Sequence, residues 1–304
     1  MKVFRFFIAC AAFAATLTAT AQVPAAITTD PALDKVNPAA METVQIPSHG
    51  ALLNGLVYVA SGAGPHGVVV LLHGFPGNEK NLDLAQAIRR DGWDVLYFDY
   101  RGSWGTPGAF SFSHAMEDTL AAVAYVRDPA VAKNLRIDST RIVLVGHSMG
   151  GFMAAYAGAQ DPKILAVALI SAWDIGAGVK LPPNAPPEAK RQLVAGVAKG
   201  LAEEGLAPLA GCTAQSLAEE LVEHAAEWRL TVFAAKLAVH PVLVITSDDG
   251  GAPASDALVA ALEQAGDREV NSVHIATDHP YSDKRIQLEE TVLDGLNYLQ
   301  HPPR

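Results

Sequence analysis

The residue with the clearest chemical pattern is Ser148, which lies in a segment, residues 146–150, that reads G-H-S-M-G. This matches G-x-S-x-G, in which a serine stands on a sharp turn between a strand and a helix. An apolar run at 141–145 precedes the segment and helix-forming residues at 149–159 follow it. Side chains at positions 146 and 150 would collide in so tight a turn. We predict that Ser148 is a nucleophile raised above a sheet; the alternative is a glycine-rich turn capped by serine.

A serine hydroxyl becomes a good nucleophile only when a base accepts its proton. The chain has ten histidines, so position must decide among them. His279 follows the last predicted strand, 272–276, and precedes the C-terminal helix, 285–300, in a loop expected at the same sheet edge as Ser148. We therefore predict His279 as the base. His147 and His274 are interpreted as packed or orienting side chains. His73 begins a turn, and His224 lies on the insertion without a recognisable partner.

A carboxylate must hold such a histidine in the tautomer that accepts the serine proton. Two aspartates, Asp248 and Asp249, follow the predicted strand 241–246. Either one would lie at the carboxyl end of that strand. The other would be a turn or cap residue, a frequent role of aspartate. The residues by themselves leave this choice open.

An acyl-transfer site also needs two backbone N–H groups aimed at the developing oxyanion. The N–H of Met149, the residue after the nucleophile, is the first of them. We expect the second in the turn after the predicted strand 67–72, where residues 71–77 read LLHGFPG, and assign it to Phe75. The alternative is that this segment is an ordinary tight turn.

Short apolar runs alternate with helical stretches along most of the chain. An unbroken apolar run, such as 67–72, is typical of a strand buried on both faces. Strands that alternate with helices imply a mostly parallel sheet covered on both sides. We therefore predict an α/β fold with a mostly parallel, doubly covered sheet. The predicted strands are 43–47, 52–60, 67–72, 94–98, 141–145, 164–170, 241–246 and 272–276, and the predicted helices are 82–90, 115–127, 149–159, 255–265 and 285–300.

One interval of about 70 residues is far longer than a crossover between strands needs. We predict that residues 174–238 form a helical cap insertion between two parts of the core, 43–173 and 239–304. One cap helix is expected at 188–201, and a capping box of Ser216 and Glu219 is expected to open another. The predicted cap helices carry apolar stripes, formed by Leu193, Val197 and Leu201 in the first and by Leu217, Leu221 and Trp228 in the second. We expect a lid that selects apolar acyl groups; the alternative is that these side chains only dock the helices.

The N-terminus has the pattern of an export signal. Lys2 and Arg5 precede an apolar run at 6–17, which a small-x-small cleavage site follows. The run is shorter than the ~20 residues that span a bilayer. We predict a signal peptide at 1–21, a leader segment at 22–42, and a periplasmic or secreted protein without a stable membrane anchor.

Composition and charge exclude several classes of protein. Half of the 304 residues are apolar and 18% are charged, which excludes a mainly disordered chain. The formal net charge is −10 and no dense Lys/Arg run occurs, so no nucleic-acid partner is expected. No metal-binding or phosphate-binding motif is found, so no metal and no cofactor is predicted. Signal cleavage would remove Cys10 and leave Cys212 as a single thiol.

The chain resembles the α/β-hydrolase superfamily over roughly residues 43–300, by the turn motif and the order serine, aspartate, histidine. Residues 98–105 read FDYRGSWG and are followed by AFSF at 109–112 and ED at 117–118. These segments are similar to the catalytic domains of prolyl oligopeptidase-type hydrolases and related secreted serine esterases.

The resemblance implies an assignment for the acid. In that family pattern a proline follows the aspartate four residues later; Asp249 with Pro253 fits and Asp248 does not. It also implies a serine hydrolase that cleaves small carboxylic esters through an acyl-enzyme. We expect no β-propeller before the domain, in contrast to prolyl oligopeptidases, and the predicted cap looks more like that of capped esterases. The alternatives are a peptidase or aminoacyl-amide hydrolase, and a binding protein on an inactive hydrolase fold.

Overall fold

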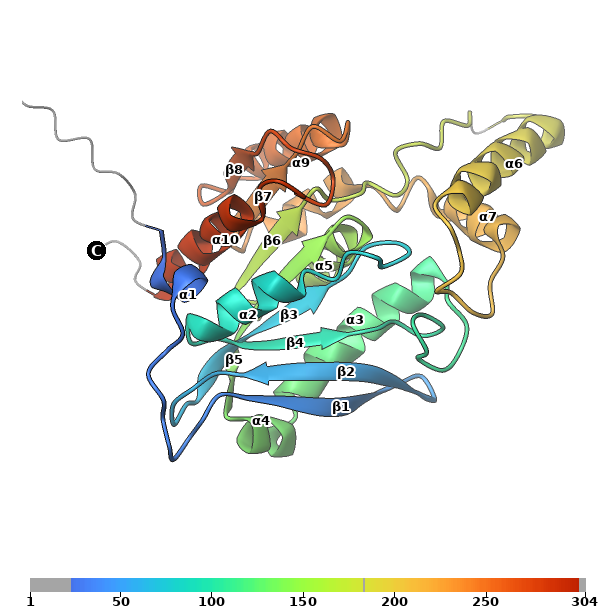
Figure 1. Cartoon of the computed structure of the whole chain (residues 1–304). Helices are drawn as coiled ribbons and strands as arrows, with labels where there is room; N and C mark the ends of the chain where they lie inside the picture. Colours follow the sequence, from blue (N-terminus) through green and yellow to red (C-terminus); the bar gives the residue numbers. More distant parts are fainter. Residues whose placement is uncertain (1–22, 183, 301–304) are drawn as a thin grey trace, which may run out of the picture.

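An eight-stranded sheet forms the centre of the protein in the computed structural model, which describes residues 23–182 and 184–300 (Figure 1). The strand order is β1-β2-β4-β3-β5-β6-β7-β8. Strand β2 runs antiparallel to both neighbours, and all other pairs are parallel. The strands are β1 (Ala40–Ser48), β2 (Ala51–Val59), β3 (His66–Leu72), β4 (Asp94–Phe98), β5 (Ile137–His147), β6 (Ala166–Ile170), β7 (Val242–Thr246) and β8 (Asn271–His274). The predicted mostly parallel α/β sheet is confirmed.

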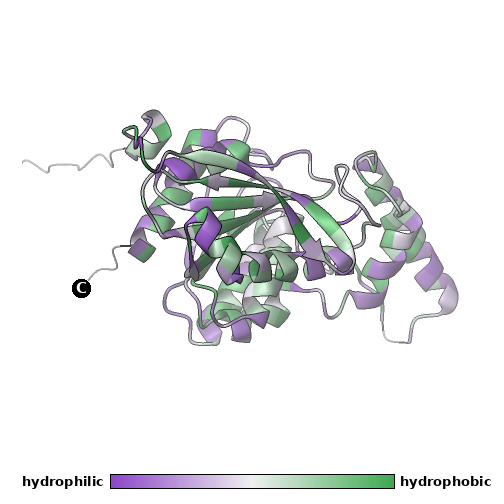
Figure 2. Ribbon diagram, turned by 90° about the horizontal axis from the view of Figure 1, so that it is seen from below, coloured by the Kyte–Doolittle hydropathy of each residue, from purple (hydrophilic) through white to green (hydrophobic). Residues whose placement is uncertain are grey.

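The central strands are buried on both faces, as their unbroken apolar sequences predict. In β3, Val68, Val70 and Leu72 contact one hydrophobic cluster, whereas Val69 and Leu71 contact the other. This division follows from the two-residue period of a strand. Figure 2 shows the strands as mainly hydrophobic and the outer parts of the helices as more hydrophilic. Both faces of the sheet therefore require a helical layer.

Helices supply both layers. On one face lie α1 (Ala25–Thr28), α2 (Leu82–Arg90) and α10 (Arg285–Gln300); on the other lie α3 (Phe112–Arg127), α4 (Pro129–Leu135), α5 (Met149–Gln160), α8 (Ala234–Leu237) and α9 (Ala252–Gln264). Within the described ranges, no helix combines the length and the apolar character that crossing a membrane requires.

Helix boundaries differ from the sequence prediction where polar side chains cap them. Helix α3 begins at Phe112, three residues before the predicted start, because the Ser111 hydroxyl accepts a hydrogen bond from the N–H of His114. Helix α4 was not predicted. It begins two residues after α3 ends, and the Asp128 carboxylate between them accepts from the N–H groups of Ala130 and Val131.

The N-terminal predictions fall partly outside the description. The predicted signal peptide, 1–21, lies outside the described residues. In the predicted leader, 22–42, residues Ala25–Thr28 form α1 and contact α2 and α10, and Arg90 donates to the carbonyl of Ala26. Strand β1 begins at Ala40. The segment therefore contributes to the fold more than its composition indicates.

The predicted cap contains two long helices, α6 (Pro187–Glu203) and α7 (Ala214–His224), which pack against each other beyond one end of the sheet (Figure 1). Thr213 and Ser216 form the capping box of α7, so the predicted box of Ser216 and Glu219 is wrong. The observed box begins three residues earlier, at Thr213. Its fourth residue is a serine, whereas the predicted box has a glutamate at that position.

The end of the predicted insertion, 174–238, belongs to the core. The 3-10 helix η1 (Leu230–Phe233) and α8 contact α5 and α9, which cover the sheet. Trp228 lies past the end of α7 and not on its apolar stripe, contrary to the prediction. An apolar segment predicts burial but not the layer in which it is buried.

Side-chain and backbone hydrogen bonds hold the cap in place on the core. The Glu220 carboxylate accepts hydrogen bonds of 2.9 Å from the N–H groups of both Phe112 and Ser113, at the start of α3. Such a carboxylate is stabilising at a helix N-terminus. Backbone hydrogen bonds tie Ala210 to Gly102 and Phe110. At the base of the cap, Arg229 pairs with the buried Asp174 carboxylate at 3.0 Å.

Candidate active site

Ser148 stands at the predicted turn between β5 and α5. Its backbone φ is +57° and its ψ is −122°, a conformation that L-residues rarely adopt. A Cβ atom at Gly146 would lie 2.0 Å from the carbonyl oxygen of Gly150, and one at Gly150 would lie 2.1 Å from that of Leu72. Backbone packing therefore requires glycine at both positions, in agreement with the predicted collision of side chains there.

Two backbone N–H groups beside Ser148 are available as donors. Met149 is the first residue of α5, and first-turn N–H groups have no partner within their own helix. Phe75 follows β3, in a loop that approaches closely enough for a Cβ at Gly74 to lie 2.9 Å from the Cβ of Ser148. Neither N–H donates to a protein acceptor within the part of the chain that the structure describes. The two predicted oxyanion donors thus come from backbone segments that adjoin Ser148, and Phe75 lines the same cavity.

Asp249 and His279 form a close pair. The distance from Asp249 Oδ2 to His279 Nδ1 is 2.6 Å, and Asp249 Oδ1 also accepts from the N–H of Gly251 at 2.7 Å. Burial alone would raise the pKa of Asp249, but these two hydrogen bonds outweigh it and hold that pKa below its usual value. Because Nδ1 donates to the carboxylate, Nε2 is the nitrogen of His279 left to accept a proton.

The neighbouring Asp248 has a different partner. Its Oδ1 lies 3.1 Å from His274 Nε2, and His274 Nδ1 lies 2.9 Å from the Thr246 hydroxyl. This second pair is exposed to solvent and does not line the cavity around Ser148. The structure therefore separates the two aspartates that the residues alone could not distinguish.

Ser148 and His279 face a common cavity of about 680 Å³, which Asp249 and Phe75 also line. In the described residues no hydrogen bond joins the Ser148 hydroxyl to His279. Such contacts are often long in an unliganded site and tighten when substrate binds. The structure thus brings serine, histidine and aspartate to one cavity.

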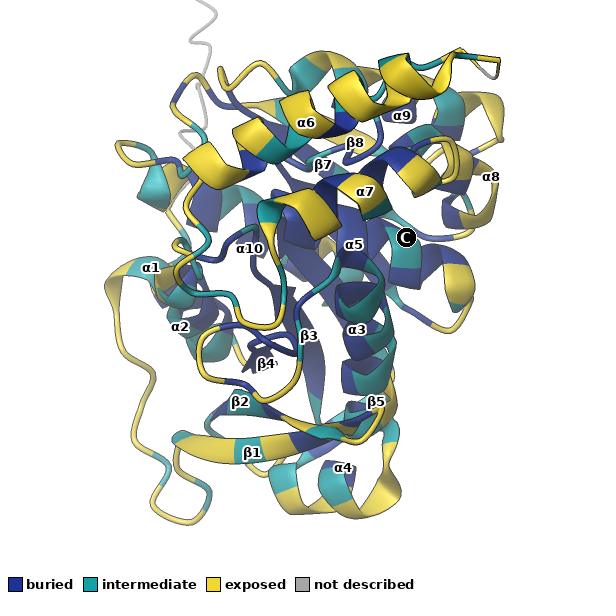
Figure 3. Cartoon of the chain, turned by 90° about the vertical axis from the view of Figure 1, so that its right-hand side faces the viewer, coloured by how far each residue is buried: buried dark blue, intermediate teal, exposed yellow. Residues whose placement is uncertain are grey.

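The wall of this cavity is mainly apolar. The cap helices contribute Val197, Leu201 and Leu221, and the segment that leads from β6 into the cap contributes Trp173 and Ile175. Figure 3 shows α6 with an exposed outer side and partly buried residues on its inner side. Glu203 and Glu204, near the end of α6, are acidic residues that the cap adds to the lining, and none of the described residues that line it is a lysine or an arginine. The cavity suits an uncharged apolar group and offers no cation to a carboxylate.

The segment 98–105 supports this site through a buried charge cluster that its sequence alone does not predict. The buried Asp118 carboxylate accepts from Arg101 Nε at 2.6 Å, from the N–H of Arg101 at 2.8 Å and from the Ser48 hydroxyl at 2.6 Å. Arg101 also pairs with Glu117. This cluster fixes the loop to which the cap is hydrogen-bonded. The family pattern was a signal for it, because it contains both Arg101 and Asp118.

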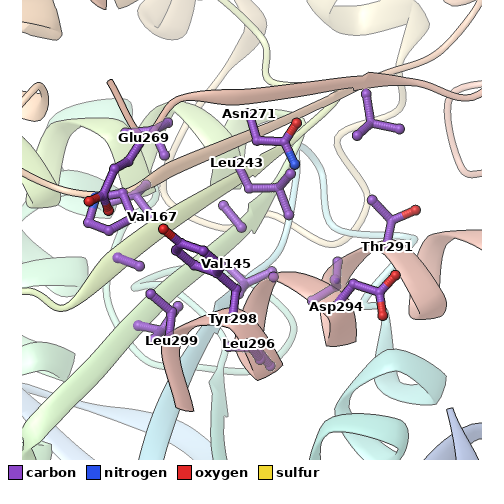
Figure 4. Close-up of a pocket in the computed structure, with 18 residues that line it drawn as sticks. Val145, Val167, Leu243, Glu269, Asn271, Thr291, Asp294, Leu296, Tyr298 and Leu299 are labelled. Carbon is purple, nitrogen blue, oxygen red and sulfur yellow. The ribbon is translucent and has the colours of Figure 1, made fainter. Parts of the chain in front are cut away.

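A second cavity, of about 460 Å³, lies between the later strands of the sheet and α10 (Figure 4). Its floor includes Val145, Val167 and Leu243, and Asp294 and Tyr298 come from α10. It shares no residue with the cavity at Ser148. Over the ranges described here, no group of three or more His, Cys, Asp or Glu side chains is arranged to hold a metal ion.

Known proteins show similarity in sequence over part of the chain. A family model described as the alpha/beta hydrolase fold matches residues 67–258. An uncharacterized protein of Mycobacterium tuberculosis is 31% identical over 133 residues, which is 43% of this chain and 46% of that protein. Cutinase 2 of Thermobifida cellulosilytica is 26% identical over 122 residues, 40% of this chain and 45% of the cutinase. The chain thus spans less than half the length of these curated relatives.

Solved structures show the same fold over most of the chain. EstE1, a thermophilic carboxylesterase cloned from a metagenomic library, has a TM-score of 0.61 and 20% identity, covering 88% of this chain and 91% of that one. Est1E from Butyrivibrio proteoclasticus, solved with ferulic acid bound, has a TM-score of 0.63 and 21% identity, covering 84% and 99%. At these identities the likeness concerns the fold alone.

The packing at the turn yields a test of stability. Gly150→Ala places a methyl group 2.1 Å from a backbone oxygen, so we expect a loss of about 3 kcal/mol or more in the free energy of unfolding. Gly196→Ala in α6 is the matched control, because nothing lies within 4 Å of its added Cβ. It should stabilise the protein by up to ~1 kcal/mol, as alanine favours a helix over glycine. Urea unfolding measures both, and equal stability of the two variants would contradict the packing argument.

Proposed function

We propose that this chain, which belongs to the alpha/beta hydrolase fold family, is a serine hydrolase that cleaves carboxylic esters through an acyl-enzyme. The observation that carries the proposal is the arrangement around one cavity: Ser148 on its strained turn, and His279 with Asp249 2.6 Å from its Nδ1. The names of the relatives support the ester class, since they include a cutinase and a carboxylesterase.

The geometry suggests how each group acts. The Ser148 hydroxyl oxygen attacks the ester carbonyl carbon while His279 Nε2 accepts its proton. Asp249 holds the Nδ1–H of His279 and stabilises the imidazolium that forms. The N–H groups of Phe75 and Met149 bind the oxyanion. The alcohol leaves with the proton from Nε2, and water then attacks the acyl-enzyme with His279 again as the base, which releases the acid and restores Ser148.

The substrates that fit this proposal are small esters with an apolar acyl group. The cavity presents Val197 and Leu201 from α6 and Leu221 from α7, and its described lining contains no lysine or arginine. Leu193 and Leu217 pack in the core cluster and do not line the cavity. The apolar stripes of the cap therefore divide into positions that can touch substrate and positions that dock the helices. We also propose export to the periplasm or the medium, from the signal-like residues 1–21.

The first test is covalent labelling. A fluorophosphonate probe should label the protein at one serine, and peptide mapping should place the label on Ser148. Ser148→Ala should abolish both labelling and ester hydrolysis while the folded state remains. Ser171 is a built-in control, because it lines the same cavity but hydrogen-bonds to Ser247 and Tyr281 at 2.8 Å. A label on any other serine, or hydrolysis by the alanine variant, would overturn the proposal.

The two aspartates provide the second test. Asp249→Asn should lower kcat on the order of 10⁴-fold, because an asparagine amide favours the wrong tautomer of the base. Asp248→Asn should change kcat much less, since Asp248 pairs with His274 at the surface. Steady-state kinetics on one nitrophenyl ester compares the variants directly. If Asp248→Asn proves the more damaging, the acid has been assigned to the wrong residue.

The third test concerns the acyl group. Each methylene buried by the cavity should contribute ~0.8 kcal/mol, so kcat/KM should rise from acetyl toward longer acyl chains. Val197→Ala should reduce that preference about five- to tenfold by removing apolar wall, at roughly 1 to 1.5 kcal/mol. Leu193→Ala, on the same helix but outside the lining, is the control and should leave the preference unchanged. A flat profile in all three proteins would show that the cap only packs.

A further inference from the structure

His147 is in direct contact with the proposed base. It is the last residue of β5 and is 3% exposed. Its Nε2 lies 2.9 Å from the backbone carbonyl oxygen of His279, and the two imidazole rings lie 4.7 Å apart at 41°. His147 therefore contacts both the backbone and the ring of His279.

The hydrogen bond fixes the tautomer of His147. A carbonyl oxygen only accepts, so Nε2 of His147 carries the proton and Nδ1 does not. Nδ1 is buried and has no hydrogen-bond partner in the described residues. Burial, helped by the nearby His279, lowers the pKa of His147 to about 4. His147 therefore stays neutral near pH 7 and adds no positive charge beside His279.

The loop that carries His279 is anchored on both sides of this contact. Before it, the Thr277 carbonyl accepts from the N–H of Asp248 at 2.9 Å. After it, the Pro280 carbonyl accepts from Arg285 at 2.9 Å, and Tyr281 OH lies 2.8 Å from the Ser171 hydroxyl. At position 279 itself, His147 is the one donor to the carbonyl that the described residues supply.

We propose that His147 is a positioning residue, which holds His279 in register between Asp249 and Ser148. The proposal rests on the serine hydrolase function argued above. Its physical basis is chain connectivity, because His147 directly precedes Ser148. The backbone segment that carries the nucleophile thus also holds the base. The positions of Ser148 and His279 are therefore fixed relative to each other. A displacement of ~1 Å between such groups can lower the rate about 100-fold.

Substitutions at position 147 separate the donor from the ring. His147→Phe keeps an aromatic ring but removes the N–H, and we expect kcat to fall between ten- and 100-fold while KM stays within about twofold. His147→Gln retains an N–H₂ group at nearly the distance of Nε2 and should recover most of the loss. His274→Phe is the matched control, since His274 hydrogen-bonds to Thr246 and Asp248 and, among the described residues, makes no hydrogen bond to His279; it should leave kcat unchanged.

The outcomes distinguish this proposal from the function on which it rests. A wild-type protein that neither hydrolyses esters nor labels at Ser148 refutes the proposed function. An active wild type with His147→Phe and His147→Gln at equal kcat refutes the positioning role alone. If His147→Phe does not fold, His147→Asn replaces it, because its shorter amide cannot reach the carbonyl. A kcat at least tenfold lower for Asn than for Gln supports the proposal, and equal values overturn it.

Discussion

The turn at Ser148 exists because three backbone segments approach to near contact. A Cβ at Gly150 would lie 2.1 Å from the Leu72 carbonyl of β3, and one at Gly146 would lie 2.0 Å from the carbonyl of Gly150. A non-glycine residue held at positive φ costs roughly 1 to 3 kcal/mol, so the surroundings must over-determine it. Buried strands on each side of β5 and the start of α5 do so. Phe75, Asp249 and His279 line the cavity into which this turn presents Ser148.

Parallel topology explains why residues far apart in sequence meet there. The carboxyl ends of β3, β5, β7 and β8 lie at one edge of the sheet. Phe75, Ser148, Asp249 and His279 follow these four strands in that order. In an open α/β sheet, ligands bind at this edge. The cap helices extend over the same end, so the edge becomes a cavity and not an open face (Figure 1).

Local sequence predicts those features of the fold and the site that depend on a single segment. It does not predict features that depend on a contact between segments far apart in the chain. The buried strands and the turn at Ser148 follow from their own residues. The choice between Asp248 and Asp249 does not, because it depends on which histidine each meets across the sheet edge. Family resemblance supplied that choice. Likewise, nothing within residues 230–237 reveals that they pack on α5 and α9 instead of joining the cap.

Two separate sets of contacts hold the walls of the cavity in place. The cap side depends on Glu220 at the start of α3 and on the loop that the buried Arg101–Asp118 pair holds. The base side depends on Asp249 and His147, which reach His279 from β7 and β5. A buried pair such as Arg101–Asp118 is costly to break, because one charge is then left unpaired. Because the two sets of contacts are separate, residues of the cap that line the cavity can change without displacing His279; under the proposed function, acyl selectivity and proton transfer are therefore physically independent.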